Sequence, residues 1–341
     1  MVSQTRKSQD EKVSHHCRID DALLLRNSAG GINADAQLFE TFAQSKAEIQ
    51  KIVQRFGYVR KWFWIQSLLN NESFVNSMLN DIGKPALHDL NFMMKLAVGF
   101  KWIDLKPDEF KFEAYEPRGR SSKLVTGQYN NNEKKCSINL GLFTKIFLEP
   151  KARQPTNINE KQLVEFLEEI YSTIVHEGFH AVQNSSILND KRPGNRASAN
   201  DISNFKEGGA IFVESIAKSL ITTSWPLMIS NDSSSLENSF LLNFAMDHVS
   251  NAIYERHDKI RDMLKNFVPH EAGMFIFAVR YIANGGFINT LKEISKMAEQ
   301  GDVSNEELYR MLDKDIENGN LTKLKQKTQN VLDRALQRNI K

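Results

Sequence analysis

Residues 176–180 read His-Glu-Gly-Phe-His and lie within a stretch whose apolar residues recur at helical spacing. Because an α-helix turns once every 3.6 residues, His176 and His180 present their imidazoles on one face, one turn apart. Two such nitrogens can bind one Zn²⁺ ion at about 2.0–2.1 Å. Glu177 points about 100° away around the helix, where it can act as a general base on a metal-bound water. The motif therefore predicts a metal-binding helix. The alternative is a surface helix on which two histidines and a glutamate coincide.

A third ligand must come from a second element, because catalytic zinc sites usually take three protein ligands and leave a fourth position for water. Glu207 is favoured because the small residues 208–210 follow it, and small residues let a second helix approach the first closely. A solvated carboxylate at a helix start is the alternative interpretation of Glu207, since the helix dipole also favours an acidic residue there. We predict a zinc site formed by His176, His180 and Glu207. The other downstream candidates are Asp190, Asp201, Glu214, His248 and His257.

Composition is that of an ordinary soluble protein. Of the 341 residues, 41% are apolar and 25% are charged, and the net charge of +2 gives no bias toward nucleic acid. Cys17 and Cys136 are far apart and form no Cys-x-x-Cys pair, so neither a disulfide framework nor a thiolate zinc site is expected. Residues 1–20 lack the apolar core of a signal peptide, and no apolar run is long enough to span a membrane. We expect a cytoplasmic protein; export without an apolar signal stays open, as does the oligomeric state.

Hydrophobic periodicity predicts a mostly helical chain with a small sheet. Alternation over 110–115 indicates a strand, and 124–129 and 135–140 flank an asparagine-rich turn, as in a β-hairpin. Asn159 and Gln162 have capping-box spacing at the start of the helix that carries the histidines. The expected fold class is α+β, with a small mixed sheet packed on the metal-binding helix. Helices are predicted over 36–58, 59–69, 73–82, 86–100, 159–184, 204–221, 235–266, 271–284, 286–299, 304–315 and 320–338, with Gly83 and Pro85 ending the third.

The motifs around the histidines resemble those of the gluzincin-type zinc metallopeptidases, which belong to the peptidase MA-like superfamily. In these enzymes a second helix opens with Glu-Gly-x-Ala-x-aromatic-Val-Glu, and residues 207–214 are similar to it. The resemblance implies that Glu207 is the third zinc ligand and that Glu214 orients a ligand. Gly127-Gln128-Tyr129 and 135–140 resemble the turn and edge strand that precede the metal helix, where strand addition would hold a peptide. Residues 272–288 are similar to the closing helix pair.

The implied activity is zinc-dependent hydrolysis of a peptide or protein by an endopeptidase. Glu177 would take the proton of the metal-bound water and pass it to the leaving nitrogen. For the oxyanion donor we expect His270, with Tyr254, His257 and Tyr281 as further candidates. A hydrogen-bonded histidine at a helix start is the alternative for His270. The aminopeptidase signature Gly-x-Met-Glu-Asn is missing, which favours an endopeptidase, and Gln183 and Ser186 depart from the metzincin pattern.

Four regions follow from this interpretation. Residues 1–34 are expected to form a flexible N-terminal tail and 35–105 an N-terminal helical region. A zincin-like metallopeptidase domain would cover 106–300, with a C-terminal helical extension over 301–341. The polar segment 185–203 makes the gap before Glu207 longer than in the related enzymes, and a surface loop or lid would absorb it. Two other functions stay open, an inactive zincin-like binding protein and a zinc hydrolase of a non-peptide substrate.

Overall fold

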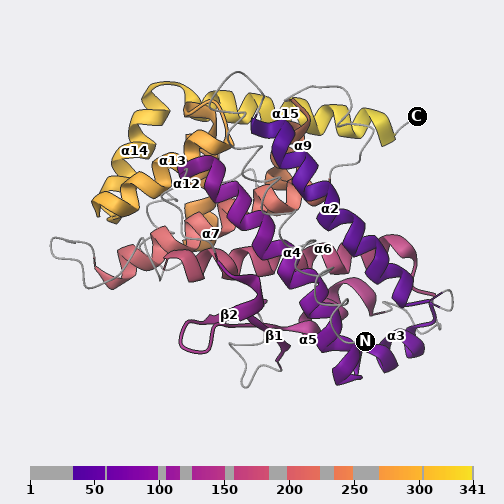
Figure 1. The fold of residues 1–341 in the computed structure, drawn as a ribbon. Helices are drawn as coiled ribbons and strands as arrows, with labels where there is room; N and C mark the ends of the chain where they lie inside the picture. The colour runs from indigo at the N-terminus through magenta and orange to yellow at the C-terminus, as the bar shows by residue number, and fades with distance from the viewer. Residues whose placement is uncertain are drawn as a thin grey trace.

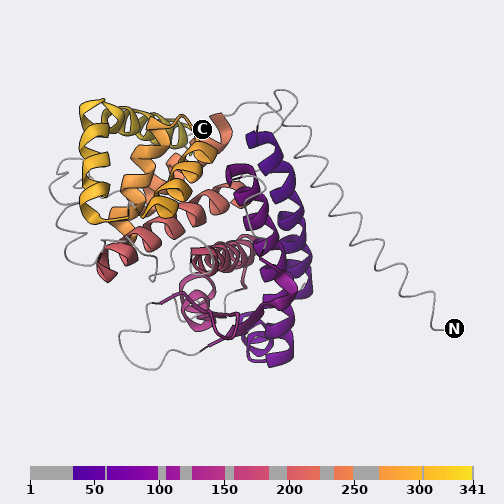
Figure 2. The same cartoon turned by 60° about the vertical axis from the view of Figure 1, so that its left-hand side comes forward.

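The computed structural model describes residues 34–57, 60–98, 105–115, 125–149, 157–183, 198–222, 234–248, 269–301 and 303–339. The described part is mostly helical with one small mixed sheet, as predicted, and its buried apolar residues form a continuous core. The sheet and helices α12–α15 lie on opposite sides of the pair α6 and α7 (Figures 1 and 2). The elements are α2 (Ala34–Arg55), α3 (Trp62–Leu69), α4 (Glu72–Val98), η2 (Pro107–Glu109), β1 (Lys111–Ala114), β2 (Gly127–Asn130), β3 (Lys135–Ile138), α5 (Leu140–Phe143), η4 (Thr144–Leu148), α6 (Glu160–Val182), α7 (Ala199–Thr222), α9 (Ser234–His248), α12 (Pro269–Ala283), α13 (Phe287–Gln300), α14 (Asn305–Glu317) and α15 (Asn320–Asn339).

Helix α4 is continuous, so the predicted break at Gly83 and Pro85 is wrong. Pro85 removes one backbone N–H from the helix, which costs about 3 kcal/mol in an isolated helix. Here both halves of α4 are buried against α2, α6 and β1, and this packing outweighs the lost hydrogen bond. Gly83 serves packing, because a Cβ at that position would lie 2.5 Å from the ring of Phe112 on β1. The glycine thus allows the sheet to rest directly on α4.

The three strands form a mixed sheet in the order β1-β3-β2. Strand β1 pairs with β3 in parallel, and β2 pairs with β3 in antiparallel register through the predicted hairpin. The prediction that residues 135–140 form the edge strand is therefore wrong, because β3 is central and β2 is an edge. The parallel pairing of β1 on the far side of β3 connects residues far apart in sequence, so the hairpin motif alone did not reveal it.

Helix α6 carries the histidine motif through the middle of the core. The capping box predicted at its start is present: the Asn159 side chain accepts from the Gln162 N–H at 2.8 Å, and the Gln162 side chain accepts from the Asn159 N–H at 3.1 Å. Nearly every residue from Leu163 to Val182 is buried. Because a capped and fully packed helix is held at both ends and on all sides, its histidines have fixed positions.

Helix α7 begins at Ala199, earlier than the predicted start at 204. Glu207 therefore lies inside the helix, so the alternative interpretation of it as a carboxylate at a helix start is wrong. Gly208 faces α12, where a Cβ would lie 2.6 Å from the Cα of Gly273, whereas a Cβ on Gly209 would lie 3.3 Å from the Phe179 ring on α6. The two glycines thus serve two different helix contacts, and only the second is the approach to α6 that the sequence predicted.

The C-terminal helices are joined to the core by a buried charge network. Arg280 on α12 donates to Glu293 on α13 at 2.8 Å and to Asp315 on α14 at 2.9 Å. Helix boundaries in this region agree with prediction to within a few residues, and α9 is described as far as His248. The rest of the predicted helix 235–266 lies outside the described residues, as do most of the N-terminal tail and most of the loop 185–203. No described helix has the length and apolarity needed to cross a bilayer.

Candidate metal centre

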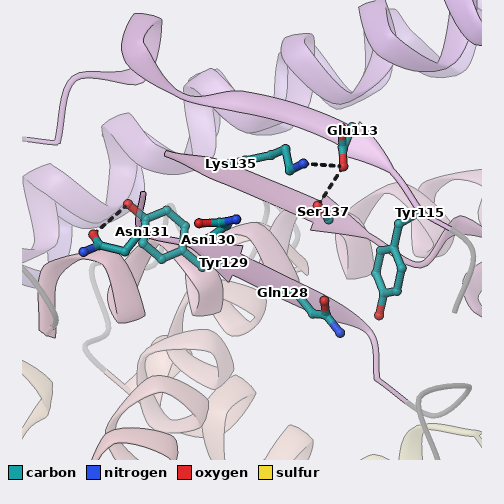
Figure 3. Close-up of a pocket in the computed structure, with 8 residues that line it drawn as sticks. All are labelled: Glu113, Tyr115, Gln128, Tyr129, Asn130, Asn131, Lys135 and Ser137. Atoms are coloured by element: carbon teal, nitrogen blue, oxygen red, sulfur yellow. Dashed lines mark hydrogen bonds and ion pairs between the residues drawn. The ribbon is translucent and has the colours of Figure 1, made fainter. Parts of the chain in front are cut away.

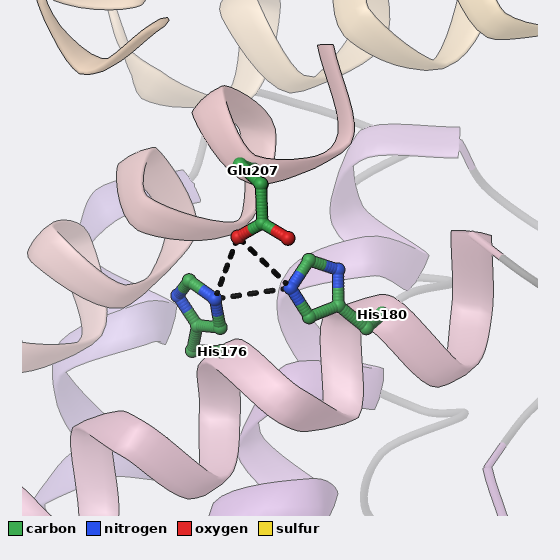
Figure 4. A group of neighbouring side chains, drawn as sticks. All are labelled: His176, His180 and Glu207. Atoms are coloured by element: carbon green, nitrogen blue, oxygen red, sulfur yellow. Dashed lines mark hydrogen bonds and ion pairs between the residues drawn. The ribbon is translucent and has the colours of Figure 1, made fainter. Parts of the chain in front are cut away.

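Three predicted ligands converge between α6 and α7. The imidazoles of His176 and His180 project from α6 toward the carboxylate of Glu207 on α7 (Figure 4). The two histidine Nε2 atoms are 3.0 Å apart, and Glu207 Oε2 lies 3.5 Å from the His176 Nε2 and 3.4 Å from the His180 Nε2. The structure thus brings together residues that are separated by a turn of helix and by the whole α6–α7 connection.

The spacing of these three atoms fits a tetrahedral metal ion. Ligands held about 2.0–2.1 Å from a tetrahedral centre are separated from one another by about 3.3 Å, and the three measured distances lie close to that value. Two imidazole nitrogens and one carboxylate oxygen also form a donor set that zinc accepts in catalytic sites. The residues present therefore fit a zinc ion with one coordination position left open.

Each histidine is held by an acceptor on its other ring nitrogen. The Nδ1 of His176 lies 2.9 Å from Oε2 of Glu214, and the Nδ1 of His180 lies 2.9 Å from Oε1 of Gln183. Gln183 is fixed in turn, because its Nε2 donates to the Lys206 carbonyl at 3.1 Å. With both Nδ1 atoms donating to these oxygens, the Nε2 lone pairs face Glu207, as metal ligation requires.

The charge balance of the centre favours a bound cation. Burial lowers the pKa of His176, but hydrogen bonds to Glu207 and Glu214 outweigh it and raise that pKa to about 10. The carboxylates around the histidine thus supply more negative charge than neutral imidazoles can balance. A divalent ion would satisfy these carboxylates in place of the proton, since metal and proton compete for the same lone pair.

Glu177 is buried beside the ligands, with only 6% of its surface exposed. Burial raises the pKa of its carboxyl, while His176 and His180 lower it and the nearby carboxylates raise it again. Strand β2 crosses directly over this side chain at Gly127, where a Cβ would lie 2.9 Å from Oε1 of Glu177. Any larger residue at position 127 would displace either the strand or the carboxylate. Gly127 is therefore a structural requirement for an edge strand that passes next to Glu177.

Of the other ligand candidates, only Asp201 and Glu214 have side chains in the described part of the structure. Asp201 caps the start of α7, where its carboxylate accepts the Ser198 N–H at 2.9 Å. Glu214 contacts His176 Nδ1 rather than the ligand face, which is the position the family resemblance implied. His248 is the last residue of α9, but its side chain lies outside the described part of the structure. Asp190 and His257 also lie outside it.

The oxyanion donor stays a prediction. His270 lies in the first turn of α12, where its side chain is outside the described part of the structure, and Tyr254 is also outside it. Tyr281 is buried in the core, with its ring centroid 4.9 Å from that of Phe240.

Tyr115 was not among the residues that the sequence predicted for the site. It follows β1, its hydroxyl donates to the Val125 carbonyl at 3.0 Å, and burial together with the charge of Glu177 raises its pKa.

Gln183 is a contact that sequence reasoning missed, although its spacing from His180 on one helix face could have revealed it. We expect Gln183→Leu to weaken zinc binding about tenfold or more, because His180 loses the acceptor that fixes its ring. Gln183→Glu keeps an acceptor and should stay within a few-fold of the wild type. Competition titration with a chelator measures both constants, and melting of the metal-free variants checks folding. Equal zinc affinity in all three proteins would contradict this role.

The outer face of the sheet carries a polar pocket of about 520 Å³. Its floor is the cross-strand group in which Ser137 donates to Glu113 at 3.1 Å and Lys135 pairs with the same carboxylate at 3.2 Å (Figure 3). Gln128 on the edge strand β2 also lines it. The pocket thus borders the edge strand on the face opposite to the one that Gly127 presents to Glu177.

Comparison with known proteins adds no relative to this picture. No protein-family model matches the chain, and neither the curated proteins nor the solved structures give a significant match. The resemblance to the gluzincin peptidases accordingly rests on the short motifs in the sequence, and what it implies about activity stays a prediction.

Proposed function

We propose that this protein is a zinc-dependent endopeptidase of the gluzincin type. The observation that carries the proposal is the group formed by His176, His180 and Glu207, whose donor atoms have tetrahedral spacing with a buried glutamate, Glu177, next to them in sequence. A surface helix with coincidental histidines would leave these side chains solvated and without outer hydrogen bonds. Here Glu214 and Gln183 hold both rings.

The chemistry divides between the ion and the side chains. Zinc, when bound, lowers the pKa of water to about 7 and polarises a carbonyl group. Glu177 takes the proton of the attacking water on its carboxylate and returns it to the leaving nitrogen. Burial suits this residue to the task, since a raised carboxyl pKa makes Glu177 a stronger base toward the attacking water. Glu214 and Gln183 keep the imidazoles aligned throughout.

A peptide substrate would bind along β2. Within the described residues β2 pairs only with β3, so its other edge is available for an added strand. Gly127 lets that edge pass beside Glu177, which would bring the backbone of an added peptide to the catalytic carboxylate. Alternate side chains of the peptide would then point toward α6 and toward the polar pocket shown in Figure 3. This geometry favours a peptide over a small non-peptide substrate.

The test is digestion of an unstructured peptide library by the zinc-loaded protein, with the products identified by mass spectrometry. We expect internal cleavages at a restricted set of sequences, lost on chelation and restored by zinc. An endopeptidase produces fragments from the middle of the peptides, whereas a peptidase that needs a free terminus shortens them from one end. A zinc-replete protein that cleaves nothing in a diverse library would contradict the proposal and favour the binding-protein alternative.

A further inference from the structure

A second pocket, of about 810 Å³, lies away from the metal centre on the same two helices. Its wall on α6 includes Glu168, which precedes His176 by about two helical turns, or roughly 12 Å along the axis. Lys218 on α7 follows Glu214 by about one turn. The other lining residues come from α2, η4 and α9 as well as α6 and α7, and they include Lys46, Phe147, Glu160, Val164, Glu165 and Glu169.

Most of the charges around this pocket are paired. Three of its four glutamates form ion pairs with a neighbouring cation, at 3.1, 3.6 and 2.6 Å: Glu160 with Arg60, Glu165 with Lys161, and Glu169 with Lys218. These carboxylates need no further partner. Glu168 differs from them.

Glu168 is only 7% exposed, and among the described residues none forms a hydrogen bond or ion pair with its carboxylate. The positive charge of Lys46 on α2 lowers the pKa of Glu168, but burial outweighs this effect and raises that pKa to about 7. A buried carboxylate without a hydrogen-bond donor is costly, and a cation placed against it recovers that cost. The wall of the pocket therefore contains one carboxylate that receives no hydrogen bond or ion pair from another described residue.

The partner that fits is an organic cation. A metal ion would need several ligand atoms close together, but the carboxylates of this pocket form no such group among the described residues. Phe147 and Val164 add an apolar wall next to the acceptor. We propose that this pocket binds a small primary amine with an apolar body, whose ammonium group hydrogen-bonds to Glu168. This binding is independent of peptide hydrolysis.

The experiment is calorimetric titration of the zinc-loaded protein with 4-phenylbutylamine at pH 8. We expect saturable binding of one molecule per chain, and no comparable binding of the neutral 4-phenylbutan-1-ol or of 4-phenylbutyrate. Glu168→Gln should weaken amine binding about 10–100-fold, because the charge-assisted hydrogen bond is lost. Glu165→Gln is the matched control: Glu165 lines the same pocket but is already paired, so its loss should change affinity less than about threefold. Glu207→Gln should bind the amine unchanged, which excludes the amine as a zinc ligand.

The pH dependence gives an independent readout. Lys46, Lys218, Glu165 and Glu169 act on Glu168 from α2, α7 and α6, while α9 and η4 present only uncharged Asn243 and Phe147. Since the pKa of Glu168 in the folded protein is raised above its ordinary value of 4.5, its contribution to folding stability is fully present below that value and is lost as pH rises toward 7. Glu168→Gln should therefore raise the melting temperature at pH 8 and change it little at pH 4.5, provided the chain is still folded there. Amine affinity should increase about tenfold or more from pH 5 to pH 8 as Glu168 ionises.

Three results would overturn the proposal. One is the absence of saturable amine binding to the wild-type protein. Another is equal loss of affinity in Glu168→Gln and Glu165→Gln, and the third is equal affinity for the amine and the alcohol. None of these results depends on whether a cleavable peptide is found, so the amine-binding proposal and the peptidase proposal can be rejected independently.

Discussion

Glu177→Gln is expected to abolish peptide cleavage while leaving zinc bound. An amide cannot take a proton from the attacking water, and removal of a general base lowers kcat/KM by about 10²–10⁴-fold. Glutamine has the same shape, and Glu177 is not one of the three converging donor atoms, so zinc content should stay at the wild-type value. The measurement is cleavage of a library peptide under conditions where zinc per chain is determined in the same sample.

Glu165→Gln, on the same helix but in the second pocket, serves as the control for Glu177→Gln and should keep wild-type activity. Undiminished turnover by Glu177→Gln would exclude Glu177 as the base, whatever the zinc content. Loss of zinc together with activity would instead show that Glu177 supports the metal.

Gly208→Ala is expected to destabilise the fold by several kcal/mol and to disturb the metal centre. Alanine normally stabilises a helix interior relative to glycine by about 1 kcal/mol. At this position its Cβ would lie 2.6 Å from the Cα of Gly273, a backbone atom that cannot move alone, so α7 and α12 must separate. Glu207 is the preceding residue and would move with α7, so zinc affinity should fall as well.

Gly141→Ala is the matched control for Gly208→Ala. It also replaces a helical glycine, on α5, but its Cβ would meet nothing closer than 3.7 Å, which is an ordinary contact. Denaturant unfolding of the two variants compares their stabilities directly. If Gly208→Ala were as stable as Gly141→Ala and bound zinc normally, the close crossing of α7 and α12 would not be what positions Glu207.

Local signals in the sequence predicted the elements whose structure is locally determined. The capping box at Asn159 and the apolar spacing after it placed α6 almost to the residue, because each depends on neighbours within a few positions. The β2–β3 hairpin also depends on near neighbours in sequence, and its two strands and the turn between them were predicted. The ligand triad needed one long-range step, from the histidines to Glu207, and the small residues after Glu207 pointed to it.

What the sequence did not reveal depends on packing between distant segments. The central position of β3 comes from parallel pairing with β1, and no residue of the hairpin signals that pairing. Helix α4 continues through Pro85 because β1, α2 and α6 bury it on several sides. The free energy gained from this burial is not part of local helix propensity. Glu168 lies between an apolar residue and another glutamate, so only the packing of α2 and α7 shows that it is buried.

X-ray absorption spectroscopy at the zinc edge tests the central claim most directly, because it reports which atoms surround the ion. The protein purified with zinc is expected to hold one ion per chain, coordinated by two imidazole nitrogens and one carboxylate oxygen, with a further light atom at the open position. Glu207→Ala should lose the carboxylate contribution and most of the affinity, whereas Glu214→Gln should keep all three ligands. A protein that takes up no zinc when it is offered, or a zinc shell unchanged by the loss of Glu207, would contradict the account.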